Sequence, residues 1–258
     1  MNILQFSILC FTLYSSIVAQ AHPITNPVVK RAIIFDCDGV LVDTELLKFL
    51  AWQKTFAQYG ITFEQEEYLP LVGYSSTYIF DNIIKQKNVK LSEDFIDQKN
   101  AYYQELQRAG VPPLEGAIKF AQKLAAKKKE LGIILGLASS AGRDEIMVNL
   151  KQIGLADIFD VIVSGHDDLA EYSDPAGTNK PKPYIYQKAA QLLGVSPSQC
   201  VVFEDTNAGV TAAVSAGMIA IATPNAYTRT HDFSQAKYVL NSFDAISVDG
   251  IVAPSLKA

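Results

Sequence analysis

The chain has 258 residues, of which 49% are hydrophobic, and its formal net charge is −5 at pH 7. This length and composition suffice for one globular unit, or two small ones, with a sizeable core, and we favour a monomer. A mildly acidic chain is not typical of proteins that bind nucleic acid or anionic membranes, so neither is expected as a partner.

The first 21 residues contain no charged side chain and carry an apolar run from Ile8 to Tyr14 before they end in Ala-Gln-Ala. This pattern is typical of a secretory signal peptide that is cleaved after Ala21. A functional leader would place the protein in the periplasm or outside the cell, and otherwise we expect it in the cytoplasm. No later stretch has the ~18–20 apolar residues needed to span a bilayer, so no membrane association is expected after leader removal.

The first predicted strand is the apolar run from Arg31 to Phe35, which two acids, Asp36 and Asp38, and then Gly39 follow. Such a run is typical of a buried parallel strand, and open α/β sheets bind ligands at the carboxyl ends of these strands. The strand would hold Asp36 rigidly enough for nucleophilic attack, and alternation would place Asp38 on the same side for proton transfer. The alternative is an ordinary Asp-Gly surface turn.

After Thr44 the hydrophobic spacing becomes that of helices, and Pro112 and Pro113 end the helical stretch. We predict an all-helical cap over residues 45–113, inserted into a core domain made of the segments 30–44 and 114–258. Within the cap, we expect helices over 46–59, 75–86 and 92–109. A cap would close over a substrate and exclude water by bending near its two linkers, whereas the alternative is a static helical bundle.

The rest of the chain alternates between apolar runs and helical patterns, which predicts an α/β fold with a doubly wound parallel sheet. A parallel sheet of this kind carries helices on both faces. The predicted strands cover residues 131–140, 159–163, 200–205, 219–222 and 238–240, and the predicted helices include 115–129 and 208–216.

Polar side chains follow several of these strands. Ser139 and Ser140 end the second strand, where a hydroxyl serves either as a helix N-cap or as an anion contact, and Ser140 is a candidate cap. Lys180 lies in a Lys-Pro-Lys-Pro sequence and offers a compact positive charge. The fourth strand ends in a second acidic pair, Glu204 and Asp205.

The string Phe35-Asp36-Cys37-Asp38-Gly39-Val40, followed by Asp43 and Thr44, resembles the first motif of the haloacid dehalogenase superfamily of phosphohydrolases. The likeness is to the branch that contains β-phosphoglucomutase and the sugar phosphate phosphatases. Ser139, Lys180 and the Glu204-Asp205 pair match the later motifs in the expected order. The resemblance implies a Rossmann-like core with a helical cap, and a Mg²⁺-dependent phosphomonoesterase that acts on a small, sugar phosphate-like metabolite.

The resemblance also implies roles at the phosphoryl group. Asp36 would be the nucleophile that forms an aspartyl phosphate, and Asp38 would be the general acid and base. Ser139 and Lys180 would act in catalysis by contacting the transferring phosphoryl oxygens. Ser140 and Gly39 are further expected phosphate contacts.

The same resemblance implies how Mg²⁺ would be bound. Asp36 and Asp205 would offer carboxylate oxygens and Asp38 its backbone carbonyl. Glu204 would be either a further ligand or a group that supports the ligands.

Two positions depart from the mutase pattern. The segment Leu71–Ser76 aligns with a loop in which β-phosphoglucomutase has an arginine for the phosphate that is not transferred, and here no arginine is near. Lys48 stands where the mutase has a histidine. A mutase has to hold a bisphosphate at both ends, so the sequence favours simple hydrolysis.

Three alternatives remain open at this point. A phosphomutase would use the same core. A haloacid dehalogenase would need neither a second acid nor a metal, so Asp38 and Asp205 argue against it. The third alternative is a non-catalytic phosphate-binding module.

Outside these motifs, Cys37 and Cys200 are expected at opposite ends of the sheet, too far apart for a disulfide. His166 follows the third strand and is interpreted as an ordinary loop residue. The irregular loop from Leu169 to Asn179 either lines the entrance to the site or decorates the surface.

Overall fold

The computed structural model describes residues 31–74 and 76–252. Its centre is a six-stranded parallel sheet in the order β3-β2-β1-β4-β5-β6, which confirms the predicted doubly wound α/β fold. The strands are β1 (Arg31–Phe35), β2 (Ile133–Ser139), β3 (Val161–Ser164), β4 (Cys200–Glu204), β5 (Ile219–Ala222) and β6 (Tyr238–Val239).

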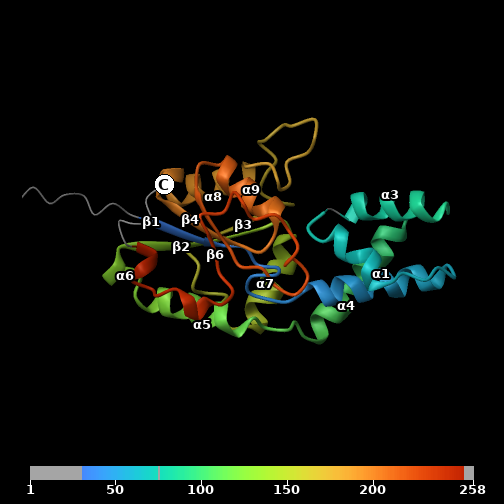
Figure 1. The fold of residues 1–258 in the computed structure, drawn as a ribbon, viewed down its shortest axis with the longest axis horizontal. Helices are drawn as coiled ribbons and strands as arrows, with labels where there is room; N and C mark the ends of the chain where they lie inside the picture. Colours follow the sequence, from blue (N-terminus) through green and yellow to red (C-terminus); the bar gives the residue numbers. More distant parts are fainter. Residues whose placement is uncertain (1–30, 75, 253–258) are drawn as a thin grey trace, which may run out of the picture.

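Helices cover both faces of the sheet (Figure 1). Along β1, Ile33 and Phe35 point into one hydrophobic cluster while Ala32 and Ile34 point into the other, which explains why the strand is apolar throughout. The covering helices are α5 (Glu115–Ala126), α6 (Lys128–Leu131) and α7 (Arg143–Gln152) on one face, and α8 (Tyr184–Leu193) and α9 (Asn207–Ser215) on the other.

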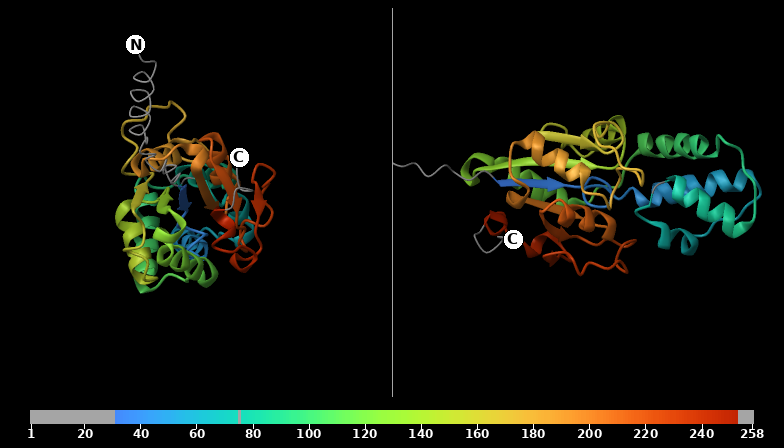
Figure 2. Two further views of the ribbon diagram at one scale, coloured as in Figure 1. Left: turned by 90° about the vertical axis from the view of Figure 1, so that its left-hand side faces the viewer. Right: turned by 90° about the horizontal axis from the view of Figure 1, so that it is seen from above.

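The segment between β1 and α5 forms a helical group beyond one end of the sheet (Figure 2). Its elements are α1 (Glu45–Gln58), α2 (Gln65–Tyr68), the 3₁₀ helix η1 (Leu69–Leu71), α3 (Ser76–Lys87) and α4 (Phe95–Ala109). An aromatic cluster around Trp52, Phe56 and Phe95 forms its own core, separate from the two clusters of the sheet. The elements between β1 and α5 are thus all helical, while the cap bounds 45–113 stay a prediction.

Two backbone segments join this helical group to the sheet, and they lie side by side. The Asp43 N–H donates to the Pro112 carbonyl over 2.8 Å, and the Leu114 N–H donates to the Leu41 carbonyl over 2.9 Å. Val42 forms an isolated antiparallel bridge with Pro113. The two predicted hinge regions are therefore neighbours, and any movement of the helices would bend both.

Several predicted boundaries differ from the observed ones. The second strand begins at Ile133 rather than at Leu131, because α6 occupies Leu131 and Gly132 turns the chain with a left-handed backbone. In α1, Leu46 and Leu50 are 41% and 36% exposed, because aromatic side chains of the same helix fill the cap core instead.

The remaining short elements are the 3₁₀ helices η2 (Pro197–Gln199), η3 (Phe243–Ala245) and η4 (Gly250–Val252). Cys37 and Cys200 are buried free thiols, as expected. The predicted leader, residues 1–21, lies outside the described residues, and its cleavage stays a prediction. No helix within the described ranges is long and apolar enough to cross a membrane.

The separate cap core generates a first prediction. Phe56 is fully buried, with its ring 4.7 Å from that of Phe95 and 5.0 Å from that of Phe63 between centroids. We expect Phe56→Ala to destabilise the cap by about 3–5 kcal/mol through lost burial and a cavity. In amide hydrogen exchange, protection should fall in α1, α3 and α4 while the strands of the sheet keep theirs. Leu50→Ala on the same helix is the matched control; equal losses in cap and sheet would contradict two separate cores.

Candidate active site

A cavity of about 310 Å³ lies between the carboxyl end of the sheet and the helical group. The predicted site residues that line it are Asp36, Asp38, Ser139, Ser140, Lys180, Glu204 and Asp205. Gly39 is the predicted residue that the structure does not place on its wall. Segments more than 100 residues apart in the sequence thus meet in one place, as the parallel topology requires.

Lys180 is the centre of the buried charge in this cavity. Its ammonium donates to Asp36 Oδ1 over 2.7 Å and to Glu204 Oε1 over 2.6 Å. Burial alone would lower the pKa of Lys180, but these two carboxylates raise it above its ordinary value. Lys180 therefore stays protonated and carries a fixed positive charge beside Asp36.

Asp36 continues β1 by one residue, since its N–H donates to the Phe203 carbonyl on β4 over 3.0 Å. Burial raises the pKa of Asp36 to about 7, and the positive charge of Lys180 offsets only part of this effect. The strand gives the carboxylate the rigid support that the sequence predicts.

Hydrogen bonds surround Glu204 on all sides. Its Oε1 also accepts from the Tyr186 hydroxyl over 2.6 Å, and its Oε2 accepts from the Asp205 and Thr206 N–H groups over 3.1 and 3.4 Å. Helix α9 approaches the carboxylate so closely that a Cβ on Gly209 would lie 1.9 Å from it. Of the two alternatives for Glu204, these contacts favour the supporting one, in which it holds Lys180.

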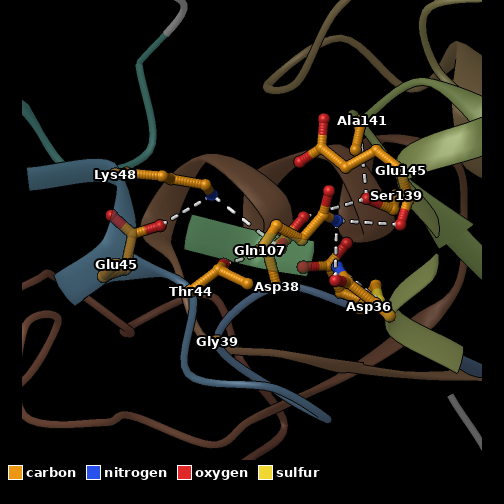
Figure 3. Close-up of polar contacts among 12 residues, drawn as sticks. Asp36, Asp38, Gly39, Thr44, Glu45, Lys48, Gln107, Ser139, Ala141 and Glu145 are labelled. Carbon is orange, nitrogen blue, oxygen red and sulfur yellow. Dashed lines mark hydrogen bonds and ion pairs between the residues drawn. The ribbon is translucent and has the colours of Figure 1, made fainter. Parts of the chain in front are cut away.

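Asp38 lies between the sheet and the helical group (Figure 3). The Thr44 hydroxyl donates to Asp38 Oδ1 over 2.6 Å, and the Ser139 hydroxyl lies 3.4 Å from Oδ2. The Lys48 ammonium is 4.0 Å from Oδ1 and 2.9 Å from Glu45. Thr44 and Lys48 thus connect the second acid to the linker and the first helix of the cap.

Ser139 and Ser140 have different positions. Ser139 is buried, and its Oγ accepts the Ala141 N–H over 3.2 Å. Ser140 lines the cavity but is not a helix cap, so that expectation was wrong. Helix α7 begins at Arg143, whose N–H donates instead to Asp167 Oδ2 over 2.7 Å, from the loop after β3.

The acids of the cavity fit a magnesium ion. One ligand oxygen each from Asp36, Glu204 and Asp205 lies within 4.8 Å of the other two. Asp205 Oδ1 is buried without a hydrogen-bond partner among the described residues, while its Oδ2 accepts from Asn225 over 2.8 Å. Burial raises the pKa of Asp205 well above its ordinary value, since little positive charge compensates the carboxylate. Mg²⁺ would supply that charge and prefers such oxygen ligands.

Gly39 does not line the cavity, but it allows the loop after β1 to approach Asp205 closely. Its φ is +82°, and a Cβ at this position would lie 2.1 Å from Asp205 Oδ2. Its carbonyl accepts from the Asn225 side chain over 3.2 Å. Glycine therefore lets the loop after β1 pack against Asp205, whereas a phosphate contact by Gly39 stays a prediction.

Sequence reasoning missed three polar residues that line the cavity from helices: Lys99 and Tyr103 on α4 of the cap, and Glu145 on α7 of the core. Lys99 is 5% exposed, donates to Ser76 Oγ over 3.0 Å and lies 5.1 Å from the Trp52 ring. The spacing of four between Lys99 and Tyr103 places them on one helix face, but the sequence does not tell which face of α4 lines the cavity.

His166 and the loop before Lys180 contribute little to the lining of the cavity. His166 lines it but is 77% exposed and contacts Asp167 over 2.9 Å, as expected of an ordinary loop residue. In the loop before Lys180, Asp174 pairs with Lys182 over 3.0 Å, and none of residues 169–179 lines the cavity. The structure thus favours surface decoration for this loop.

Comparison with known proteins identifies the family. Residues 33–223 match the haloacid dehalogenase-like hydrolases. The chain is 31% identical to the phosphorylated carbohydrates phosphatase of Thermotoga maritima, over 82% of this chain and 91% of that protein. It is 33% identical to the beta-phosphoglucomutase of Bacillus subtilis, over 74% of this chain and 82% of that protein. A solved structure of a CbbY variant from Rhodobacter sphaeroides, in complex with xylulose-(1,5)bisphosphate, has a TM-score of 0.69 and 28% identity, covering 83% and 94% of the two chains.

The parallel sheet, the helical insert and the acids at the strand ends therefore define an α/β hydrolytic enzyme of a known kind. The chain belongs to the haloacid dehalogenase-like hydrolase family. Its relatives in that family include named phosphatases, so the chain is a phosphatase-like enzyme.

The burial of Lys99 generates a prediction about pH. Desolvation, helped by the nearby Lys48 charge, lowers the pKa of Lys99 from 10.5 to about 8. Between these values the folded protein has lost the proton and the unfolded chain has kept it, so the stability contributed at this site rises with pH. We compare the free energies of unfolding of the wild type and Lys99→Met. Between pH 8 and 10.5, we expect the difference, wild type minus variant, to rise by up to about 3 kcal/mol.

Urea unfolding of both proteins at several pH values measures this difference. Lys54→Met, which removes an exposed lysine from α1, is the control and should follow the wild type throughout. Parallel pH curves for the wild type and Lys99→Met would contradict the assignment.

Proposed function

We propose that this chain is a Mg²⁺-dependent phosphomonoester hydrolase that acts on a small phosphorylated metabolite through an aspartyl phosphate on Asp36. The observation that carries the proposal is the contact of Asp36 with Lys180, beside the unpartnered oxygen of Asp205. A nucleophilic carboxylate, a fixed cation and a metal-binding carboxylate are the groups that phosphoryl transfer requires.

In the first step, a carboxylate oxygen of Asp36 attacks phosphorus in line with the leaving oxygen. Lys180 neutralises the charge that accumulates between the carboxylate and the phosphoryl oxygens, and Glu204 keeps its ammonium in place. The Ser139 hydroxyl lies at the end of β2 on the same side and would donate to a phosphoryl oxygen. These roles depend on positioning, because phosphoryl transfer asks little else of the protein.

Asp38 is the proposed general acid and base. It would protonate the leaving alcohol and then remove a proton from the water that hydrolyses the aspartyl phosphate. Thr44 orients the carboxylate through the hydrogen bond of 2.6 Å. Because Thr44 lies at the start of the cap, the position of the helices would set the position of this acid.

Mg²⁺, when bound, supplies positive charge to the transferring phosphoryl group and orients it toward the nucleophile. Asp36 and Asp205 would hold the ion with the backbone carbonyl of Asp38. Glu204 would support this set, since both of its oxygens already accept hydrogen bonds from protein groups.

We also propose that residues 45–113 act as a mobile cap. Their separate hydrophobic core would let them move as a unit, and the paired linkers at Asp43 and Pro112 provide a common hinge. Closure would bring Lys48, Lys99 and Tyr103 against the leaving group and exclude water.

A phosphomutase is the rival function, and the 33% identity to a beta-phosphoglucomutase favours it. The lining of the cavity argues against it, because among the described residues it contains Lys48, Lys99 and Lys180 but no arginine. A mutase has to hold the second phosphate firmly enough to turn its intermediate over. Isomerised sugar phosphate, formed in the presence of a bisphosphate primer, would establish the rival.

The proposed nucleophile is tested by Asp36→Asn. The amide cannot form the acyl phosphate, so we expect the turnover of p-nitrophenyl phosphate to fall by about a thousandfold or more. Acid quenching during turnover should trap phosphoprotein in the wild type and none in the variant. Asp157→Asn, on the exposed surface, is the matched control. Substantial turnover by Asp36→Asn would reject the mechanism.

The proposed metal site is tested by comparing Asp205→Asn with Glu204→Gln. We expect EDTA to abolish turnover and Asp205→Asn to raise the Mg²⁺ concentration for half-maximal binding about tenfold or more, since it removes a ligand. Glu204→Gln should lower turnover mainly by releasing Lys180, with a smaller change in Mg²⁺ affinity. Calorimetric titration with Mg²⁺ measures both affinities, and the opposite order would make Glu204 the ligand.

A further inference from the structure

Two opposite charges line the cavity from helices rather than from strand ends, and we call this part of the lining the helical wall. Lys99 comes from α4 in the cap, and Glu145 comes from α7 in the core. Among the described residues, no ion pair within 4.0 Å joins the two.

The other positive charge near this wall is already engaged. Lys48 lies 2.9 Å from Glu45 and 4.0 Å from Asp38, so two carboxylates share its ammonium. Among the hydrogen bonds of the described residues, the Lys99 ammonium has one partner, the neutral hydroxyl of Ser76. Glu145 is thus the negative charge that offsets Lys99, in the part of the cavity where we propose that the leaving group binds.

Tyr103 adds a polar group to the same wall. Its side chain is 4% exposed, and its hydroxyl interacts with Glu145 without reaching good hydrogen-bond geometry within residues 31–74 and 76–252. Burial and the nearby Asp38 raise the pKa of Glu145, while Lys48, Tyr103 and Lys99 act in the opposite direction. A ligand hydroxyl that binds to both the Tyr103 hydroxyl and Glu145 would complete hydrogen bonds that the two groups make poorly with each other.

The donors and acceptors on this wall match a neutral, hydroxylated group. Lys99 can only donate, the Glu145 carboxylate can only accept, and the Tyr103 hydroxyl can do both. Alcohol groups donate and accept, so neighbouring hydroxyls of a polyol or sugar would satisfy all three. A second phosphate could use Lys99 but would face the carboxylates of Glu145 and Asp38.

We propose that Glu145 is a specificity-determining residue, which binds hydroxyl groups of the leaving alcohol and discriminates against a leaving alcohol that carries a second anionic group. The inference rests on the proposed phosphomonoesterase function and narrows its substrates to monophosphates of neutral polyols and sugars. In this inference the selection between substrates depends on Glu145, a negative charge on the core, together with Lys99, a positive charge on the cap.

The test compares the wild type with Glu145→Gln on fructose 6-phosphate and fructose 1,6-bisphosphate, which differ by one phosphate. We expect the wild type to prefer the monophosphate in kcat/KM. Removing the negative charge leaves Lys99 uncompensated, so the ratio of the two kcat/KM values should shift toward the bisphosphate by about tenfold or more. Asp144→Asn, the neighbouring exposed acid on α7, is the matched control and should leave the ratio unchanged.

Direct binding provides a second readout that does not depend on turnover. In an Asp36→Asn background, the ratio of the two Kd values should shift in the same direction when Glu145→Gln is added. A wild type that prefers the bisphosphate, or ratios that Glu145→Gln leaves within twofold, would overturn the inference while leaving the phosphatase function in place. A wild type that hydrolyses neither sugar phosphate nor p-nitrophenyl phosphate would instead reject the proposed function.

Discussion

The interaction on which the site depends is the double ion pair of Lys180 with Asp36 and Glu204. Three charged groups are buried together here, and each would be costly to bury alone. Glu204 holds the lysine from behind, with Tyr186 and the N-terminus of α9 as its own supports. Asp36 then receives a fixed positive charge from Lys180 and also lines the cavity.

The ion pairs of Lys180 depend on the whole core, because the sheet positions the segments that carry the three charged groups. Asp36 and Glu204 follow adjacent strands, and Lys180 reaches them from the segment before α8. Close packing supports the arrangement, because Gly39 and Gly209 let backbone segments approach the acids where any side chain would collide with a carboxylate. The sheet, its tight turns and its buried charges therefore together hold the Asp36 carboxylate rigidly at the cavity, where we propose that it attacks phosphorus.

The sequence was sufficient to predict the sheet, the helical insert and the acids and lysine at the strand ends. These follow from apolar runs that end in polar residues, because parallel strands bring such ends to one edge. It was not sufficient for Lys99, Tyr103 and Glu145, which lie on helices whose facing is decided by the packing of cap against core. Ser140 was misinterpreted as a cap because its substitute, Asp167, comes from a distant loop.

The neighbouring linkers have a consequence for how such a protein can change over time. The chain leaves the sheet at Asp43 and returns at Pro112, and these two points are joined by a hydrogen bond. The whole helical segment is thus a single insertion at one point of the core domain. Helices of another length or shape could occupy that place without any strand changing its partners. The sheet domain and the helical insert can therefore change in sequence and length largely independently of each other.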